Sequence, residues 1–406
     1  MENPKIRFKG FTKDWEQRKL GDVCSRVQGN DGRMKLPTLT ISAGNGWMRQ
    51  EDRFSGNIAG NEQKNYTLLH TGELSYNHGN SKLAKYGAVF SLRNYEEALV
   101  PRVYHSFRVE EGCADYIEYY FATKLPDREL RKLISSGARM DGLLNIGYDE
   151  FMGIKMMFPS IKEQNEIATY FRSLDHLITL HQRKCEQTKK LKKYMLQKMF
   201  PQNGAKVPEI RFYGFTYDWE QRKLKEIADK VSEKNKNNEF SEPFTNSAEQ
   251  GIISQKDYFD REIVNNENLD SYYIVRNDDF IYNPRISVMA PVGPINRNRL
   301  GRNGVMSPLY TVFRTHDIDN LYLEFYFKTT KWHRFMKLNG DSGARFDRFT
   351  ISSTQFMEMP IPYPMLDEQR KIGEYFDSLD NLITLHQRKC DELKKMKKYM
   401  LQNMFI

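Results

Sequence analysis

Residues 4–20 read PKIRFKGFTKDWEQRKL, and residues 208–224 read PEIRFYGFTYDWEQRKL. The two stretches are identical at 14 of 17 positions, at an offset of 204 residues. A second repeat is longer: residues 173–200 return as residues 378–405, with 22 of 28 positions identical at an offset of 205. Because the two offsets are nearly equal, the 406-residue chain consists of two copies of one unit, and the copies should fold as a pseudo-dimer.

Between the repeated ends, residues 25–158 and 229–363 differ at most positions but stay in register. Tyr76-Asn77 aligns with Tyr282-Asn283, and the Ser-Gly-Ala-Arg stretch at 136–139 aligns with the one at 342–345. This combination predicts one fold with two different surfaces. The shared frame should position each copy, and the variable loops should decide what each copy contacts.

Composition narrows the class of protein. A hydrophobic content of 39% is enough for real cores. No run of 18 apolar residues occurs, and the first residues lack the apolar stretch of a signal peptide, so we expect a cytoplasmic protein. The 4 cysteines show no metal-ligand spacing, which argues against structural zinc and a disulfide framework. A net charge of +9 suits a polyanion such as nucleic acid, although charge alone leaves the partner open.

Two long helices are predicted after Pro159 and Pro364, each with acidic residues in its first turn. At about 38 residues, each would span roughly 57 Å, too long for a single small domain. If the helices pair along their length, they run antiparallel about a pseudo-twofold axis. Apolar residues recur with coiled-coil spacing at Ile167, Phe171, Leu174, Ile178 and Cys185, and again at Ile372, Phe376, Leu379, Ile383 and Cys390.

The sequence therefore predicts an α+β protein in which two similar domains are separated by two long antiparallel coiled-coil helices with pseudo-twofold symmetry. The expected boundaries are residues 1–158 for the first variable domain, 159–203 for the first helix, 204–363 for the second variable domain and 364–406 for the second helix.

The ends of both helices are basic and rich in methionine. The lysines can form a solvated face while the apolar face enters a core, or the apolar face can be a docking strip for another protein. A membrane-surface helix fits the pattern too, but its duplication at both ends of a pseudo-symmetric protein argues against it. The candidate docking residues are Leu191, Tyr194, Met195, Met199, Met396, Tyr399, Met400 and Met404.

No catalytic motif was found: the chain has no Gly-rich phosphate loop, HExxH, CxxC or GxSxG. The stretch from Tyr282 to Arg285 resembles part of the Asn-Pro-Pro-aromatic motif of amino-methyltransferases, but the second proline and the aromatic residue are missing. We interpret it, and its mate from Tyr76 to Gly79, as strand ends that present polar loop residues. His181 and His386 fall in the helix seam and are interpreted as packing or interhelical hydrogen-bonding groups. No catalytic or metal site is predicted.

Polar and basic loop residues are the candidate DNA contacts. Arg139 and Arg345 follow a glycine turn, where a guanidinium can hold a phosphate or read guanine; a shared turn-stabilising role is the alternative. A residue that both copies share, although they should recognise different DNA sequences, suits contact with the DNA backbone better than contact with the bases. Specificity is expected at the strand ends and where the copies differ: Asn45, Trp47, Asn77, His78, Asn80, Ser81 and Lys82 in the first copy, and Glu249, Gln250, Asn283, Arg285, Ser287, Arg348 and Thr350 in the second.

Over essentially its whole length, the chain resembles the specificity subunit of a type I restriction-modification enzyme. The resemblance rests on the WEQRKL segments at residues 15–20 and 219–224 and on the Pro-x-x-x-Glu-Gln-x-x-Ile motifs at residues 159–167 and 364–372. The shared SLDxLITLHQRK segment within each helix continues the second motif.

The resemblance implies a non-catalytic subunit without a cofactor of its own. It implies recognition of a split, asymmetric sequence in double-stranded DNA, with a spacer set by the helices. It also implies two modification subunits that carry S-adenosylmethionine, and restriction subunits that use ATP and Mg²⁺, with no membrane partner. A scaffold joining two protein partners, and a nucleic-acid enzyme acting alone, are the rival classes; a salt-dependent mobility shift on duplex DNA would separate them.

Overall fold

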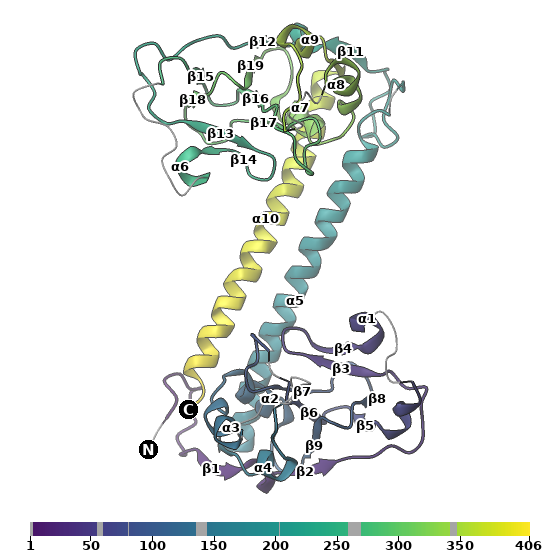
Figure 1. The fold of residues 1–406 in the computed structure, drawn as a ribbon, viewed down its shortest axis with the longest axis vertical. Coiled ribbons are helices and arrows are strands. Elements are labelled where there is room, and N and C mark those ends of the chain that lie inside the picture. Colours follow the sequence, from purple (N-terminus) through teal and green to yellow (C-terminus); the bar gives the residue numbers. More distant parts are fainter. Residues whose placement is uncertain are drawn as a thin grey trace. The chain divides into compact units, whose positions relative to one another are not determined.

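The computed structural model describes residues 3–54, 60–79, 81–134, 144–202, 204–258, 269–341 and 347–406 (Figure 1). The chain divides into two compact units. The first unit consists of Met1–Gln182 together with Arg388–Ile406, and the second consists of Arg183–Gln387. Each unit therefore combines the variable domain of one copy with the helix end that belongs to the other copy.

The first unit contains mixed helices and strands. In chain order these are β1 (Glu16–Lys19), η1 (Leu20–Asp22), β2 (Cys24–Val27), β3 (Leu39–Ser42), β4 (Gly46–Arg49), α1 (Gln50–Phe54), η2 (Gly60–Asn65), β5 (Thr67–His70), β6 (Leu74–Asn77), β7 (Ala88–Ser91), β8 (Glu97–Val100), β9 (His105–Val109), α2 (Ala114–Ala122), α3 (Asp127–Leu133), α4 (Tyr148–Met152), β10 (Lys155–Phe158) and the first part of α5 (Ile161–Lys198).

The second unit repeats this order closely. Its elements are β11 (Glu220–Lys223), η3 (Leu224–Glu226), β12 (Ala228–Lys230), β13 (Phe244–Ser247), β14 (Gly251–Ser254), α6 (Gln255–Tyr258), β15 (Tyr273–Val275), β16 (Phe280–Tyr282), β17 (Ile295–Arg297), β18 (Gly304–Met306), β19 (Thr311–Thr315), α7 (Asn320–Phe327), α8 (His333–Asn339), α9 (Ser353–Met357), β20 (Pro360–Tyr363) and the first part of α10 (Leu366–Asn403). The predicted α+β class with two similar domains and two long helices is confirmed.

Both units are built around a four-stranded antiparallel sheet with the same topology. The strand order is β2-β9-β6-β7 in the first unit and β12-β19-β16-β17 in the second. Two-stranded pairs surround each sheet: β1-β10, β3-β4 and β5-β8 in the first unit, and β11-β20, β13-β14 and β15-β18 in the second.

The inner strands β6 and β16 are covered on both faces, which explains why their residues are buried apart from Asn77 at the end of β6. In β16, Phe280 and Tyr282 enter the core beneath the helices, whereas Ile281 between them enters a smaller core shared with Phe244 and Met306. This alternation is the two-residue period of a strand. Each unit is therefore a layer of helices, a four-stranded sheet, and a second layer of short strand pairs.

A buried ion pair fastens the N-terminal segment of each copy to the start of the long helix. Arg7 donates to both carboxylate oxygens of Glu163 at 2.7 and 2.8 Å, and Arg211 does the same to Glu368 at 2.6 and 2.7 Å. Both glutamates are at most 1% exposed. Removing one partner of such a pair costs about 3–5 kcal/mol, because a charge is left buried without compensation.

The glutamine that follows each of these glutamates in the Pro-x-x-x-Glu-Gln motif holds the start of the long helix by two hydrogen bonds. Gln164 donates to the carbonyl oxygen of Pro159 at 2.9 Å and accepts from the backbone N–H of Cys113 at 3.0 Å. Gln369 makes the equivalent two bonds, to Pro364 and from Asp319. The Glu-Gln pair that repeats in the sequence is thus structural. The predicted boundaries at 159 and 364 lie just before the first residues of α5 and α10.

Inside each unit, α5 and α10 run antiparallel. In the first unit the rings of Phe171 and Phe405 lie 5.8 Å apart, and Lys397 Nζ lies 2.5 Å from a carboxylate oxygen of Asp175. Residues farther along α5 therefore contact residues nearer the start of α10.

The second unit contains the same contacts with the roles of the helices exchanged. Phe200 and Phe376 lie 6.1 Å apart with stacked rings, and Lys192 Nζ lies 2.5 Å from Asp380. At the repeat offset of 205, position 175 corresponds to 380, and position 192 corresponds to 397. The two ion pairs therefore occupy equivalent positions of the two copies, with the roles of the helices exchanged.

The predicted helix seam is confirmed at nearly every position, although much of it packs on the domain cores as well as on the other helix. The exception is Ile383, which is only half-buried. The buried seam residues are Ile167, Phe171, Leu174, Ile178, Cys185, Ile372, Phe376, Leu379 and Cys390.

The predicted docking strip needs a correction at the helix ends. Met199 and Met404 are 1% and 2% exposed because each fills the core of a unit, so the prediction that they contact a partner is wrong. Met195 and Met400 are half-buried against the same cores. The four remaining candidates stay exposed: Leu191, Tyr194, Met396 and Tyr399.

Phe405→Ala should destabilise the first unit by about 3–5 kcal/mol, since the ring is 5% exposed and packs against Trp15, Tyr116, Tyr120 and Phe171. Hydrogen exchange followed segment by segment should show lost protection in α2 and β10.

The matched control is Tyr399→Ala, which removes an aromatic side chain that is 57% exposed near the same helix end and should leave exchange unchanged. Equal protection in wild type and Phe405→Ala would contradict the role of the C-terminal segment in closing the first core.

Candidate nucleic-acid interface

Three loop segments meet at one end of the four-stranded sheet in the first unit. They are the tip of the β3-β4 hairpin (residues 43–45), the described part of the β6-β7 loop, and the segment that leads to α4. Asn77 donates from Nδ2 to the carbonyl oxygen of Ile41 at 3.2 Å, and the backbone N–H of Leu144 donates to the backbone carbonyl oxygen of His78 at 2.8 Å. We call these segments the first loop rim.

The second loop rim is held by the same bonds. Asn283 donates to the carbonyl oxygen of Asn246 at 2.8 Å, and the N–H of Phe349 donates to Pro284 at 2.7 Å. The rim consists of the β13-β14 tip (residues 248–250), the β16-β17 loop (residues 283–294) and residues 347–350. Two loop sets of different sequence are thus mounted in the same way.

Most of the predicted contact residues are accessible on these rims. Three of them, Asn80, Arg139 and Arg345, lie outside the described residues. The exposed ones are Asn45, Ser81 and Lys82 on the first rim, and Glu249, Gln250, Arg285, Ser287, Arg348 and Thr350 on the second.

Asn77 and Asn283 support the rims, and their prediction as direct DNA contacts stays a prediction. Besides the bonds given above, the Oδ1 atom of Asn77 accepts from the N–H of Gly79, and that of Asn283 accepts from the N–H of Arg285. Both side chains are half-buried, and donor and acceptor are each used inside the chain.

His78 is buried, whereas the prediction of Trp47 as a contact stays a prediction. The His78 side chain is 7% exposed and its ring lies 5.0 Å from that of His105, whose pKa burial holds below the usual value. Trp47 is half-buried against the small core of Leu39 and Ile41, and its Nε1 atom is buried without a hydrogen-bond acceptor among the described residues.

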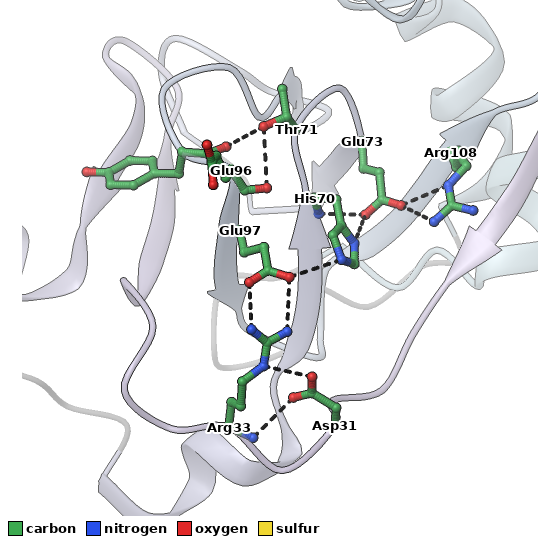
Figure 2. Close-up of polar contacts among 9 residues, drawn as sticks. Asp31, Arg33, His70, Thr71, Glu73, Glu96, Glu97 and Arg108 are labelled. Atoms are coloured by element: carbon green, nitrogen blue, oxygen red, sulfur yellow. Dashed lines mark hydrogen bonds and ion pairs between the residues drawn. The ribbon is translucent and has the colours of Figure 1, made fainter.

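At the opposite end of β6, arginines are neutralised by carboxylates (Figure 2). Arg108 donates to Glu73 at 2.9 and 2.5 Å, and Arg33 donates to Glu97 at 2.6 and 3.0 Å. His70 lies between the two glutamates, 3.5 Å from Glu73 and 3.4 Å from Glu97. Hydrogen bonding from Arg33 lowers the pKa of Glu97, so that carboxylate stays ionised.

The loop rims differ from that end in their charge. Within the described ranges, Lys82, Arg285 and Arg348 make no ion pair with a carboxylate, and all three are exposed. Uncompensated cations on exposed loops are what a phosphate backbone attracts, whereas paired arginines offer little. The first rim carries Lys82 and Lys85 without a described acidic residue, whereas Glu249 and Asp347 balance Arg285 and Arg348 on the second. The charge distribution therefore favours a polyanion most clearly at the first rim.

A cleft of about 1330 Å³ adjoins the first rim within the first unit. Asn45 and Trp47 line one side, and the α5 and α10 residues Arg172, Lys394 and Lys397 line the other. Lys397 is paired with Asp175, which leaves Lys394 as the more available cation. Lys394 thus places a cation on the helix side of the cleft, which Asp175 and Glu118 also line.

Two equivalent apolar patches remain exposed near the helix ends. Leu191 and Tyr194 are 44% and 51% exposed in the second unit, and Met396 and Tyr399 are 49% and 57% exposed in the first. The pairs are repeat mates. They are the part of the predicted docking strip that a protein partner can reach.

The chain shows no metal or membrane features in the parts that the structure describes. No three His, Cys, Asp or Glu side chains gather there as a metal site. Across the same parts, no helix combines the length and apolarity that crossing a bilayer requires.

The sequence reasoning missed three exposed apolar residues on the rims. Leu83 and Met289 are 69% and 70% exposed, and Val288 is fully exposed. The signal that could have found them is the Ser-x-x-Ala pattern at 81–84, which returns at 287–290 within otherwise divergent loops.

The family model for the type I restriction modification DNA specificity domain matches the chain twice, over residues 12–190 and 217–395. The specificity subunit of the type I restriction enzyme MjaVIII from Methanocaldococcus jannaschii is 25% identical over 304 residues, covering 71% of this chain and 68% of that protein.

Among solved structures, the S subunit of a type I restriction-modification system from M. genitalium is 14% identical and aligns over 100% of this chain and 99% of its own, with a TM-score of 0.56. The HsdS subunit from Thermoanaerobacter tengcongensis is 16% identical over 97% of both chains, with a TM-score of 0.47. The first of these shows a shared fold. Because the family model accounts for most of both halves, the chain belongs to the type I restriction modification DNA specificity domain family.

Proposed function

We propose that the chain is the DNA sequence-recognition subunit of a type I restriction-modification complex and reads a bipartite, asymmetric target with one half-site per unit. The observation that carries this proposal is the pair of loop rims. They are fastened by the same backbone bonds but present different exposed side chains, such as Lys82 on the first rim and Glu249, Arg285 and Arg348 on the second.

The exposed side chains suit the edges of base pairs. Arg285 and Arg348 can each donate two hydrogen bonds to guanine, and Glu249 can accept from the amino group of cytosine. Asn45 and Gln250 carry amides that suit adenine. For Arg139 and Arg345, which the two copies share, we propose contacts with phosphate rather than bases.

Methyl transfer and cleavage are assigned to partner subunits. On this proposal, two modification subunits bring S-adenosylmethionine, and restriction subunits bring ATP and Mg²⁺. The two equivalent patches, Leu191 with Tyr194 and Met396 with Tyr399, are proposed as docking sites for the two modification subunits. Their exposure and their relation as repeat mates support this assignment.

The purified chain should bind duplex DNA in a salt-dependent manner but neither methylate nor cleave it, because the sequence carries no catalytic motif. Mobility shifts and labelled methyl transfer, with and without a modification subunit, measure both properties. Labelled methyl groups incorporated by the chain alone would contradict the assignment, and the absence of DNA binding in any mixture would favour a protein scaffold.

Arg285→Ala should weaken binding to the target by about 1–3 kcal/mol and relax discrimination at one base pair of one half-site, since a bidentate contact to one base is lost. The other half-site should be unaffected. Binding measured on a panel of single-base variants of the target provides the test.

The matched control is Arg276→Ala. Arg276 is also exposed, but it precedes the start of β16, whereas the rim loop follows the end of that strand. It is paired with Glu233 at 3.1 Å. This variant should leave the panel unchanged. A uniform loss over all sequences in Arg285→Ala, with a salt slope reduced by about one, would instead make Arg285 a phosphate contact.

Lengthening both helices by four residues, after Gln182 in α5 and after Gln387 in α10, should lengthen the unspecified spacer by one or two base pairs. One helical turn adds about 6 Å, and a base pair rises about 3.4 Å. The paired insertion is needed because Asp175–Lys397 and Lys192–Asp380 hold the helices in register within their own units.

Sequencing the methylated sites in a host that expresses the lengthened chain with its modification subunit measures the spacer. The single insertion in α5 serves as the control and should reduce activity, because it shifts only one helix. An active double-insertion variant with the original spacer would exclude the helices as the ruler.

A further inference from the structure

A short turn with the same bonding occurs on both loop rims. The backbone N–H of Ala84 donates to Ser81 Oγ at 3.1 Å, and the N–H of Ser81 donates back to the carbonyl oxygen of Ala84 at 3.1 Å. Ala290 and Ser287 make the same two bonds, both at 3.1 Å. The hydroxyl groups of the two serines are therefore used to close the turn.

The turns project apolar side chains into solvent. Leu83 and Met289 occupy the same position of the two turns and are 69% and 70% exposed, and Val288 beside Met289 is fully exposed. Single exposed apolar residues are ordinary on protein surfaces. Here, however, the same position of the same turn is apolar in two loops whose other residues largely differ, so the feature requires a reason shared by both units.

The residues that follow each turn are anchored to the sheet. Gly87 and Gly293, which follow the turns, have φ of +83° and +82°, and a Cβ at either would collide with the carbonyl oxygen of Asn77 or Asn283. Tyrosine hydroxyls of the central strand tie the same stretch down: Tyr76 bonds to the carbonyl oxygen of Tyr86, and Tyr282 bonds to that of Val292. The stretch that follows each apolar tip is therefore fixed to the central strand of the sheet.

The surroundings of both tips suit DNA. Residues 81–87 contain Lys82 and Lys85, residues 284–293 contain Arg285, and neither stretch contains an acidic residue. A Cβ placed on Gly44 would lie 3.2 Å from Leu83 Cδ1, so Leu83 adjoins the hairpin tip that carries Asn45. An exposed apolar side chain with cationic and polar neighbours is better suited to contact with a nucleic acid than to contact with an apolar protein surface.

We propose that Leu83 and Met289, the latter with Val288, are wedges that insert into a base step of each half-site and partly unstack it. The inference rests on the proposed function, since it names how the same rims engage DNA. Leucine and methionine are among the residues that proteins insert between base pairs. Pyrimidine–purine steps unstack most easily, so one such step in each half-site should be favoured without a hydrogen bond to its bases.

The test uses the full chain and duplexes containing its target with 2-aminopurine at successive positions, because this base fluoresces more strongly when it is unstacked. Wild-type protein should raise the fluorescence at one step in each half-site. Leu83→Ala should abolish the rise in one half-site only, and the double variant Val288→Ala with Met289→Ala should abolish it in the other. Each should bind the target about tenfold more weakly.

A duplex with a mismatch at the responding step provides the second measurement. The mismatch lowers the cost of unstacking, so wild type should bind it more tightly than the intact target, and the alanine variants should lose that gain. Leu125→Ala removes a leucine that is 42% exposed outside the rims, and it should behave as wild type in both measurements.

The possible failures can be told apart. Wild type that shows no sequence-specific, salt-dependent binding would overturn the proposed function and the wedge with it. Specific binding by wild type without a fluorescence rise, or with a rise that Leu83→Ala retains, would overturn the wedge alone. Variants that bind and unstack DNA normally but lose association with a modification subunit would overturn it too, by making the tips a protein contact.

Discussion

Neither copy of the repeat closes its own hydrophobic core. The ring of Phe405, from the end of the second copy, packs among Trp15, Tyr116 and Phe171 of the first copy, and Phe200 fills the equivalent space in the second unit. Burial of an aromatic side chain is a large contribution in a domain of this size. Each long helix must therefore begin in one unit and end in the other, so folding of the cores requires both copies and both helices.

Some residues are the same or similar in both copies and form a constant frame, whereas the rim residues vary. This division follows from how much stability a substitution at each kind of position would cost. Arg7–Glu163 recurs as Arg211–Glu368, and Glu73–Arg108 recurs as Asp279–Arg314. Losing one partner of the buried pairs Arg7–Glu163 or Arg211–Glu368 costs about 3–5 kcal/mol, whereas a surface substitution typically changes stability by at most about 0.5 kcal/mol. The other two pairs contribute less, because Arg108 and Arg314 are 55% and 38% exposed. The frame pairs are therefore constrained in both copies, and the rim residues can diverge without unfolding the unit.

The sequence predicted what repetition and helical period express: two copies, two helices of 38 residues, their seam and their antiparallel direction. It predicted the wrong role for Met199 and Met404, because a helical period shows which side chains share a face but not whether a core or solvent meets that face. The supporting bond of Asn77 and the burial of His78 were missed for a related reason. A polar residue at a strand end can bond to a neighbouring loop that lies far away in sequence, as Asn77 does to Ile41, and no local pattern shows this.

The chemistry of the two rims also bears on the symmetry of a target. Lys82 and Asn45 give the first rim cationic and amide groups, whereas Glu249 on the second rim is an acceptor that discriminates against the acceptor edge of guanine and favours the amino group of cytosine. Two identical rims about a pseudo-twofold axis would read a palindrome. If the chain reads DNA as proposed, equivalent frames with unlike rims would select a target with unlike halves, and that asymmetry would come from a few exposed side chains and not from the fold.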